Sequence, residues 1–388
     1  MIINGSSRML FRPAWATVDL DALAHNYSVL KNHIPPEIGI MAMVKADAYG
    51  HGAVAVSRVL EEAGVRSLGV ATVEEGVELR DAGIKVSILV MCGLMGEGSP
   101  ASKRMIEADL TPVIHSSGAL DSLEQAATNA GRSVDVHLKI DSGMSRLGVR
   151  PEALGPVLKR LKDSPHIRVE GVMTHLADAG EEETCNKQMQ EFIPCKGVIE
   201  NELGPIKIWH VANSSALLRG WPLEVEGAGE CWARPGLALF GECDLDHPLR
   251  SKIKPVMGIE SRVMLLKTVP AGTGVSYGCT FTTKRKTRLG VVPIGYADGY
   301  PWSASGKAQV LIRGEWAPVV GRVTMDMIMI DVTDVQGVSV GDEVVLLGPQ
   351  QEATITVGEL AKWAGTIPYE ILCRVSKRMP RIYIGEKG

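Results

Sequence analysis

Short apolar runs alternate with helix-like segments through the first two thirds of the chain. The apolar runs predict eight strands, at residues 40–44, 67–71, 86–91, 111–115, 134–140, 169–174, 207–211 and 231–236. Most of these runs are continuously apolar rather than alternating, which is typical of strands that are covered on both faces. Apolar positions with a helical period predict helices before and between the strands, at 18–34, 53–63, 75–82, 119–130, 151–162 and 183–200.

The pattern changes near residue 245, where a polar stretch that contains proline begins. Beyond it, predicted strands follow one another with little helix between them, at 261–269, 289–294, 309–312, 317–323, 327–332 and 343–347. Arg313-Gly314 and Gly341-Asp342 supply turns between these strands. One short helix is predicted at 357–363.

Eight strand–helix units favour a (β/α)8 TIM-like barrel over an open, doubly wound sheet. No G-x-G-x-x-G fingerprint follows any of the predicted strands, which weakens the case for a dinucleotide-binding sheet. We therefore predict an α/β fold with a barrel at 1–245 and a mostly β C-terminal domain at 246–388. The first residues of the chain are candidates for packing on that second domain.

Composition excludes several classes of function. The net charge of the 388 residues is −4, with no basic block, so nothing indicates a nucleic-acid partner. No apolar run has the length of a transmembrane helix and no signal peptide is recognisable, so we expect a cytoplasmic protein without membrane contact. The seven cysteines are scattered and never in C-x-x-C spacing, which fits reduced thiols and no metal site.

Polar residues cluster at the ends of five of the eight predicted strands. They are Lys45 and Tyr49, then Lys139, Asp141 and Arg146, then His175, then Ser214, and finally Arg234. Gly236 and Leu237 follow Arg234 and contribute backbone amides. In a barrel the C-terminal strand ends meet on one face, which carries the active site. Each residue also has a structural explanation, such as a lysine reaching solvent, a buried histidine, a helix-capping serine or an ion-paired arginine. If these residues had only structural roles, we would expect fewer than five of the eight strands to end in polar groups.

The residue types at these ends suit a phosphate and a reactive amine. The hydroxyls of Tyr49 and Ser214 and the backbone amides near Gly236 and Leu237 can hold a phosphate without a formal charge. Phosphate sites recur at the last strands of barrels. Lys45, at the end of a buried strand, would then be placed for a Schiff base with pyridoxal phosphate.

The chain also resembles the alanine racemases, which are fold-type III pyridoxal-phosphate enzymes, essentially from end to end. The motifs that carry the resemblance are V-K-A-D-A-Y-G-H-G (44–52), H-L-K-I-D-S-G-M-S-R-L-G (137–148), T-H-L-A (174–177), A-N-S-S-A (212–216), A-R-P-G-L-A-L-F-G (233–241), V-S-Y-G (275–278), G-Y-A-D-G-Y (295–300), G-R-V-T-M-D (321–326) and Y-E-I-L-C-R-V-S-K-R-M-P-R (369–381). Their occurrence in this order is highly specific.

This resemblance implies a role for each candidate. Lys45 would hold pyridoxal phosphate covalently, and Tyr277 would be the second catalytic base, donated by the β domain of the other subunit of a homodimer. The other cofactor contacts would be Tyr49, His175, Ser214, Arg234, Gly236, Leu237 and Tyr369. Arg146 and the backbone of Met325 would bind the substrate carboxylate, and Lys139 matches a lysine that is often carbamylated and braces Arg146. The supporting positions would be Tyr296, Arg322 and Asp326.

Racemisation removes the α-proton from one face of the substrate and returns a proton to the other, so two bases on opposite faces suit it. Lys45 would serve one face and Tyr277 the other. A tyrosine with an ordinary pKa near 10 needs a polarising neighbour, and we expect a relay Tyr277–His175–Arg234 across the dimer interface. Because arginine keeps its proton, Arg234 at the pyridine nitrogen would leave that nitrogen neutral and limit transamination.

The predicted activity is the interconversion of L- and D-alanine, which would supply D-alanine for bacterial peptidoglycan. A racemase of serine, lysine or several amino acids stays open, because Gly180 and Trp302 depart from the family pattern at positions resembling the substrate entrance. A barrel-type amino-acid decarboxylase shares the architecture but usually has a cysteine-bearing motif where this chain has Val-Ser-Tyr-Gly. A non-catalytic pyridoxal-phosphate-binding protein would lack residues 246–388.

Overall fold

The computed structural model describes residues 11–94, 100–243 and 247–386. They fall into two compact units, which we call the barrel unit and the β unit. The barrel unit holds the described residues of 23–48 and 52–254, and the β unit holds those of 1–22, 49–51 and 255–388. The domain boundary that we expect after residue 245 stays a prediction.

Eight parallel strands close into a barrel in the first unit, which confirms the predicted fold class. The strands are β2 (Gly39–Met43), β3 (Ser67–Val70), β4 (Ser87–Val90), β5 (Thr111–Ile114), β6 (Val134–Lys139), β7 (Ile167–Met173), β8 (Ile208–His210) and β9 (Glu230–Ala233). Each pairs in parallel with the next, and β2 pairs with β9 to complete the ring. Every residue of β2, β3 and β8 is buried, as continuous apolar runs predict for strands covered on both faces.

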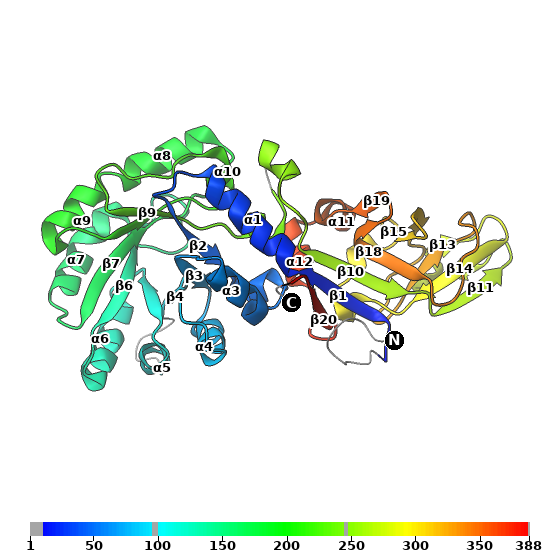
Figure 1. Cartoon of the computed structure of the whole chain (residues 1–388), viewed down its shortest axis with the longest axis horizontal. Coiled ribbons are helices and arrows are strands. Elements are labelled where there is room, and N and C mark those ends of the chain that lie inside the picture. The colour runs from blue at the N-terminus through cyan, green and yellow to red at the C-terminus, as the bar shows by residue number, and fades with distance from the viewer. Residues whose placement is uncertain (1–10, 95–99, 244–246, 387–388) are drawn as a thin grey trace. The chain divides into compact units, whose positions relative to one another are not determined.

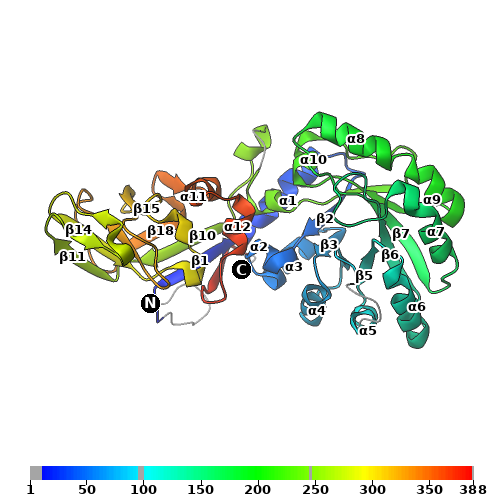
Figure 2. The ribbon, with the colours of Figure 1, turned by 180° about the vertical axis from the view of Figure 1, so that it is seen from behind.

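Helices surround the ring of strands (Figures 1 and 2). They are α3 (Ala53–Glu62), α4 (Val73–Asp81), α5 (Ala101–Glu107), α6 (Gly118–Ala130), α7 (Leu154–Lys162), α8 (Glu182–Phe192), α9 (Cys195–Leu203) and α10 (Ser214–Arg219). The single helix predicted at 183–200 is wrong: it is broken into α8 and α9 because Pro194 lacks the N–H that a continuous helix needs. The short helix α5 was not predicted.

The largest sheet of the β unit has strand order β16-β15-β18-β10-β1-β20, with β19 paired to β18. Its strands are β1 (Ala14–Asp19), β10 (Met257–Arg262), β15 (Gln309–Ile312), β16 (Glu315–Pro318), β18 (Glu343–Gln350), β19 (Ala353–Ile355) and β20 (Arg381–Ile384). The predicted helix at 18–34 is therefore wrong at its start, since α1 (Leu20–His33) begins after β1. The Asp19 side chain accepts a hydrogen bond from the Ala22 amide at 2.8 Å and marks that change.

Two smaller sheets complete the β unit, a hairpin and a three-stranded sheet of order β11-β14-β17. Their strands are β11 (Leu265–Val269), β14 (Thr287–Val292), β17 (Ile328–Asp331), β12 (Gly274–Val275) and β13 (Phe281–Thr282). The strand predicted at 261–269 is divided between β10 and β11, which belong to different sheets. The helix predicted at 357–363 is confirmed as α11 (Val357–Ala364), and α12 (Pro368–Cys373) was not predicted. Among the described residues, no helix is long and apolar enough to span a bilayer.

Candidate active site

Lys45 lies two residues after the last residue of β2 and opens an unusual backbone turn. The next four residues, 46–49, all have left-handed backbone angles, with φ of 53°, 54°, 52° and 54°. None of them is glycine, and the left-handed helical conformation costs L-residues roughly 1–2 kcal/mol each. The Lys45 side chain is partly exposed at this point, at the C-terminal end of a fully buried strand. The fold therefore strains the backbone where it presents this amine.

Four cations surround His175 at the C-terminal strand ends of the barrel. The pKa of His175 is lowered from 6.5 to about 3, first by burial and then by the charges of Arg234, Lys139, Arg146 and Lys45, in that order. The imidazole is therefore neutral at physiological pH. The predicted residues of strands β2, β6, β7 and β9 are thus brought together, and they form a positively charged site that suits an anion.

Lys139 lies buried inside the barrel, at the end of β6. Burial lowers its pKa to about 8, and the nearby Arg146 and Arg234 add to that shift. With this pKa about one tenth of the amine is uncharged at pH 7, far more than for an exposed lysine. An uncharged amine is the form that reacts with carbon dioxide or a carbonyl group.

Arg234 is 3% exposed and bonds to four uncharged acceptors. Its Nη1 lies 3.2 Å from His210 Nδ1, and its Nη2 lies 3.4 Å from His175 Nδ1. Nη2 also donates to the carbonyl oxygens of Thr174 and Val211, at 2.8 and 2.9 Å. Burial lowers the pKa of Arg234 to about 9. Because these contacts include no carboxylate, the guanidinium suits a further acceptor from a bound group.

Two histidines that sequence reasoning missed continue inward from Arg234. Since arginine only donates, His210 accepts at Nδ1 and carries its proton on Nε2. That Nε2 lies 2.7 Å from His137 Nδ1, and the other nitrogen of His137 lies 3.9 Å from Glu170 Oε2. Burial lowers the pKa of both histidines, so each is held as a neutral imidazole. His137 lies inside a motif quoted above, but its partners are far away in the sequence.

Ser214 is available to a ligand rather than used as a helix cap. The cap of α10 is Asn213, whose Oδ1 accepts from the Ala216 amide at 3.0 Å. The Ser214 hydroxyl accepts from the Gly236 amide at 2.8 Å, which leaves its own proton to donate. Leu237 follows at the start of a short 3₁₀ turn, so the predicted phosphate-binding residues of the barrel unit lie next to one another.

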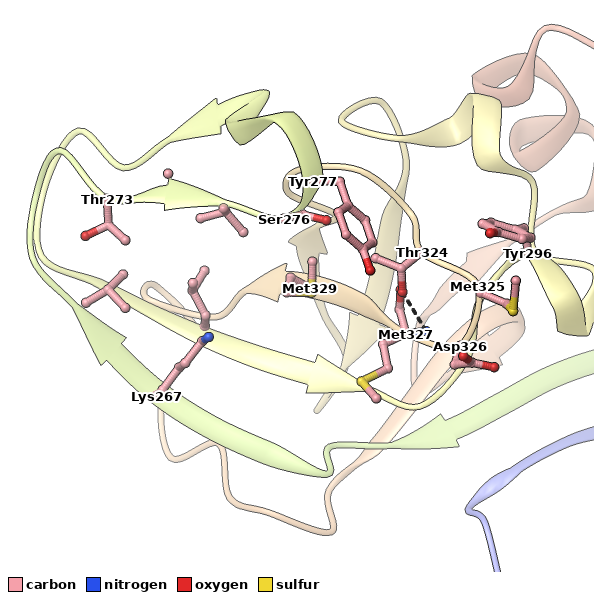
Figure 3. A pocket seen from close by; sticks show the side chains of 14 residues that line it. Lys267, Thr273, Ser276, Tyr277, Tyr296, Thr324, Met325, Asp326, Met327 and Met329 are labelled. Carbon is pink, nitrogen blue, oxygen red and sulfur yellow. Dashed lines mark hydrogen bonds between the residues drawn. The ribbon is translucent and has the colours of Figure 1, made fainter.

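The β unit carries Tyr277 on an exposed turn between β12 and β13. Its side chain is 72% exposed and lines a pocket of about 750 Å³ (Figure 3). Ser276, just before it, has a φ of 62°, and its hydroxyl donates to the Arg322 carbonyl at 2.7 Å. The pocket also contains the predicted Tyr296, Met325 and Asp326. Figure 3 shows the Tyr277 hydroxyl pointing toward the Thr324–Met327 turn.

The remaining predicted residues of the β unit are also accounted for. The rings of Tyr49 and Tyr369 lie 6.1 Å apart between centroids. Asp326 is paired with Arg378 at 2.8 Å. The guanidinium of Arg322 lies over the exposed ring of Trp302 at 5.9 Å, so the position that departs from the family pattern carries a cation–π contact. Within the described part of the chain, no group of three or more His, Cys, Asp or Glu side chains is placed to hold a metal ion.

Comparisons with known proteins agree with this geometry. The family model for the alanine racemase N-terminal domain matches residues 18–244, and the model for the alanine racemase C-terminal domain matches 256–383. The alanine racemase of Halothermothrix orenii is 41% identical over 387 residues, covering 98% of this chain and 100% of that protein.

Solved structures show the same similarity. The alanine racemase of Streptomyces lavendulae superposes with a TM-score of 0.89 and 36% identity, over 97% of this chain and 98% of that one. The alanine racemase of Bacillus anthracis with bound L-Ala-P superposes with a TM-score of 0.88 and 34% identity, over 98% and 97%. With both domain models matched and full-length relatives at this identity, the chain belongs to the alanine racemase family.

Proposed function

We propose that this chain interconverts L- and D-alanine with pyridoxal phosphate as cofactor, using Lys45 and Tyr277 as bases on opposite faces of the substrate. Membership of the family makes the chain an isomerase of the racemase class. The observation that carries the finer proposal is the positive charge around His175 at the mouth of the barrel, to which Arg234, Arg146 and Lys45 contribute besides Lys139. An anionic cofactor and a substrate carboxylate supply the negative charge that these residues lack.

The residues present fit pyridoxal phosphate. Lys45 offers an amine for its carbonyl group, and the Ser214 hydroxyl has a proton to donate to its phosphate. Arg234 offers a buried guanidinium, bonded to uncharged acceptors, for its ring nitrogen. We also assign Tyr49, His175, Gly236, Leu237 and Tyr369 to the cofactor. When bound, the cofactor stabilises negative charge at the substrate α-carbon, which makes removal of the α-proton feasible.

The roles of the chain's own residues follow from their positions. Lys45 Nζ takes or returns the α-proton on one face, and the Tyr277 hydroxyl does so on the other. Arg146 and the backbone of Met325 bind the substrate carboxylate. Lys139 is proposed to be carbamylated, because its lowered pKa leaves the amine reactive and the resulting anion would brace Arg146. Tyr296, Arg322 and Asp326 are supporting residues of the pocket around Tyr277.

The exposure of Tyr277 supports a homodimer with shared active sites. A catalytic tyrosine that is 72% exposed in its own chain has too little protein around it to exclude water from a reaction. The pocket beside it is lined by exposed apolar side chains, including Met325 and Met327. We propose that the barrel of a second copy covers this surface. In a bacterial cytoplasm, such a dimer would supply D-alanine for peptidoglycan.

The test combines a product assay with chemical trapping. Purified protein loaded with pyridoxal phosphate is incubated separately with L-alanine, L-serine and L-lysine, and the products are separated by chirality. L-alanine should racemise fastest, and borohydride should fix pyridoxal to Lys45, as located by peptide mass spectrometry. Faster racemisation of serine or lysine would replace alanine as the substrate, and failure to label Lys45 would refute the assigned cofactor attachment.

A further inference from the structure

We infer that Glu75, on helix α4 of the barrel, is a positioning residue that holds the backbone turn after Lys45 and thereby fixes where the Lys45 amine points. This inference rests on the proposed function, because it concerns the attachment of pyridoxal phosphate to Lys45. Its first support is a hydrogen bond of 2.7 Å in which the Ala46 amide donates to Glu75 Oε1.

Glu75 ties two strand ends together with one carboxylate. Its Oε2 accepts from the amides of Ala71 and Thr72, at 2.6 and 3.3 Å, just after β3. Its Oε1 accepts from Ala46, just after β2. Strands β2 and β3 are neighbours in the barrel, so this side chain bridges the C-terminal ends of adjacent strands. The peptide group that it holds is the one that joins Lys45 to Ala46.

The turn after Lys45 needs such support because its backbone is strained. Residues 46–49 all have positive φ without being glycine, and such segments persist only where surrounding contacts determine them. Inside the turn, the Ala48 amide donates to the Val44 carbonyl at 2.9 Å. At its far end, the Asp47 side chain accepts from the Ala53 amide at 2.7 Å. The hydrogen bond from the Ala46 amide to Glu75 fixes the near end of the turn, directly beside Lys45.

A second helix shows what this glutamate does beyond capping. Both α4 and α11 begin with a capping box, in which a threonine is followed three residues later by glutamate. In α11, Glu359 Oε2 accepts from both the amide and the hydroxyl of Thr356, at 2.8 and 2.9 Å. In α4, Glu75 caps with one oxygen and uses the other for Ala46. The two capping boxes therefore differ in the hydrogen bond from the Ala46 amide to Glu75 Oε1.

This difference makes glutamine an informative replacement. A glutamine side chain has a single acceptor oxygen. At position 359 one oxygen serves both bonds, so Glu359→Gln can keep its cap. At position 75 each oxygen serves a different strand end, so Glu75→Gln loses either the cap or the bond to Ala46.

The experiment compares Glu75→Gln and Glu75→Ala with the matched Glu359→Gln and Glu359→Ala, in the full chain loaded with pyridoxal phosphate. Thr72→Ala is a local control, since it removes the hydroxyl that caps Glu75 but leaves the bond to Ala46 in place. The measurements are cofactor affinity, the visible circular dichroism of the bound cofactor, the yield of borohydride labelling at Lys45, and the thermal midpoint.

Glu75→Ala should weaken cofactor affinity by at least about tenfold, as expected when a hydrogen bond to a charged group is lost, and Glu75→Gln should do the same where its single oxygen serves the cap. They should also change the visible circular dichroism, because the bound cofactor would lie in a different orientation. Thr72→Ala and the Glu359 variants should leave both properties unchanged, even where the thermal midpoint falls. If Glu75→Ala, which must lose the bond to Ala46, matches Thr72→Ala in affinity and circular dichroism, the positioning role is refuted. If borohydride fails to label Lys45 in the unsubstituted protein, the proposed function fails instead.

Discussion

The two residues proposed to move the α-proton lie in opposite kinds of surroundings. Lys45 stands at the end of a strand whose residues are all buried, inside a barrel that also buries Lys139 and Arg234. Tyr277 stands on a hairpin of the β unit and is 72% exposed. Both depend on strained backbone, since Ala46 follows Lys45 with a φ of 53° and Ser276 precedes Tyr277 with a φ of 62°.

This contrast indicates that the two proposed bases differ in how much of their surroundings their own unit supplies. The barrel supplies both its base and the charged environment of that base, with neutral His175 and buried cations close together. The β unit presents Tyr277 beside an open pocket, with little cover from its own chain. Changes near Lys45 should therefore affect folding, cofactor binding and activity together. Changes at Tyr277 should affect activity while leaving the folded chain intact.

Replacing Tyr277 by phenylalanine is the most severe test of this contrast. Loss of a proton-transferring hydroxyl should slow removal of the α-proton from one enantiomer by about 10²–10⁴-fold. The equilibrium constant links net racemisation in the two directions, so the measurement is exchange of the α-proton with deuterated solvent, starting from each enantiomer. Exchange through Lys45 should persist from the other enantiomer, and the thermal midpoint should not move. Equal slowing from both enantiomers would contradict the two-base scheme.

Mixing two inactive chains tests whether Tyr277 acts on the barrel of a second copy. Lys45→Ala and Tyr277→Phe chains with different tags are co-expressed, and the mixed dimers are purified through both tags. In a dimer with shared sites, one of its two sites combines an intact Lys45 with an intact Tyr277. The mixed dimers should therefore recover about half of the normal activity per dimer. If each site belongs to a single chain, the mixed dimers will stay inactive.

Much of the fold could be predicted because strands covered on both faces must be apolar throughout. The predicted and observed strands β3 and β5 start at the same residues, 67 and 111, which shows how well such runs mark a strand. Strand β1 could not be predicted in this way. Its partners β10 and β20 lie far away in the sequence, so the short segment 14–19 shows no local pattern that separates it from the helix after it.

The site was predictable to the extent that its residues carry their chemistry in their own side chains. Lys45, His175 and Arg234 were found as polar residues at strand ends, and the structure brings them together. Glu75 and His137 were missed because their importance lies in partners far away in the sequence, Ala46 and His210. The left-handed turn at 46–49 was also missed, because alanine and aspartate there give no local signal of positive φ.

A third prediction concerns how pH acts on the β unit. Glu260, on β10, is largely buried, and burial raises its pKa from 4.5 to about 7 although Thr17 donates to it at 2.9 Å. The negative charge of Glu343 adds to the shift. A carboxyl with a raised folded pKa contributes its stability fully below the unfolded pKa of 4.5 and loses it as pH rises through 7.

The loss over this range is on the order of 3 kcal/mol. Glu260→Gln cannot ionise and keeps an acceptor for Thr17. It should therefore unfold at a higher denaturant concentration than the unsubstituted chain at pH about 8, with little difference at pH about 5. If both chains lose stability equally between these pH values, Glu260 is not the responsible group. This prediction sharpens the contrast, because the titrating group of the β unit, Glu260, belongs to its largest sheet and not to the pocket around Tyr277.

The smallest expected effect tests the barrel side of the contrast, where buried groups should tune the chemistry of the site. Carbamylation of Lys139 joins its uncharged Nζ to the carbon of carbon dioxide and releases one proton, so the side chain becomes an anion beside Arg146 and Arg234. Lys139→Ala should then lower kcat/KM by about tenfold through a less firmly held Arg146. Lys196→Ala, which removes a partly buried lysine paired with Glu200 on helix α9, should not lower kcat/KM. Isotopically labelled bicarbonate should give a carbamate signal in the unsubstituted protein that is lost in Lys139→Ala. If that signal is absent, a plain lysine holds the position, and the barrel tolerates three neighbouring cations there without an internal anion.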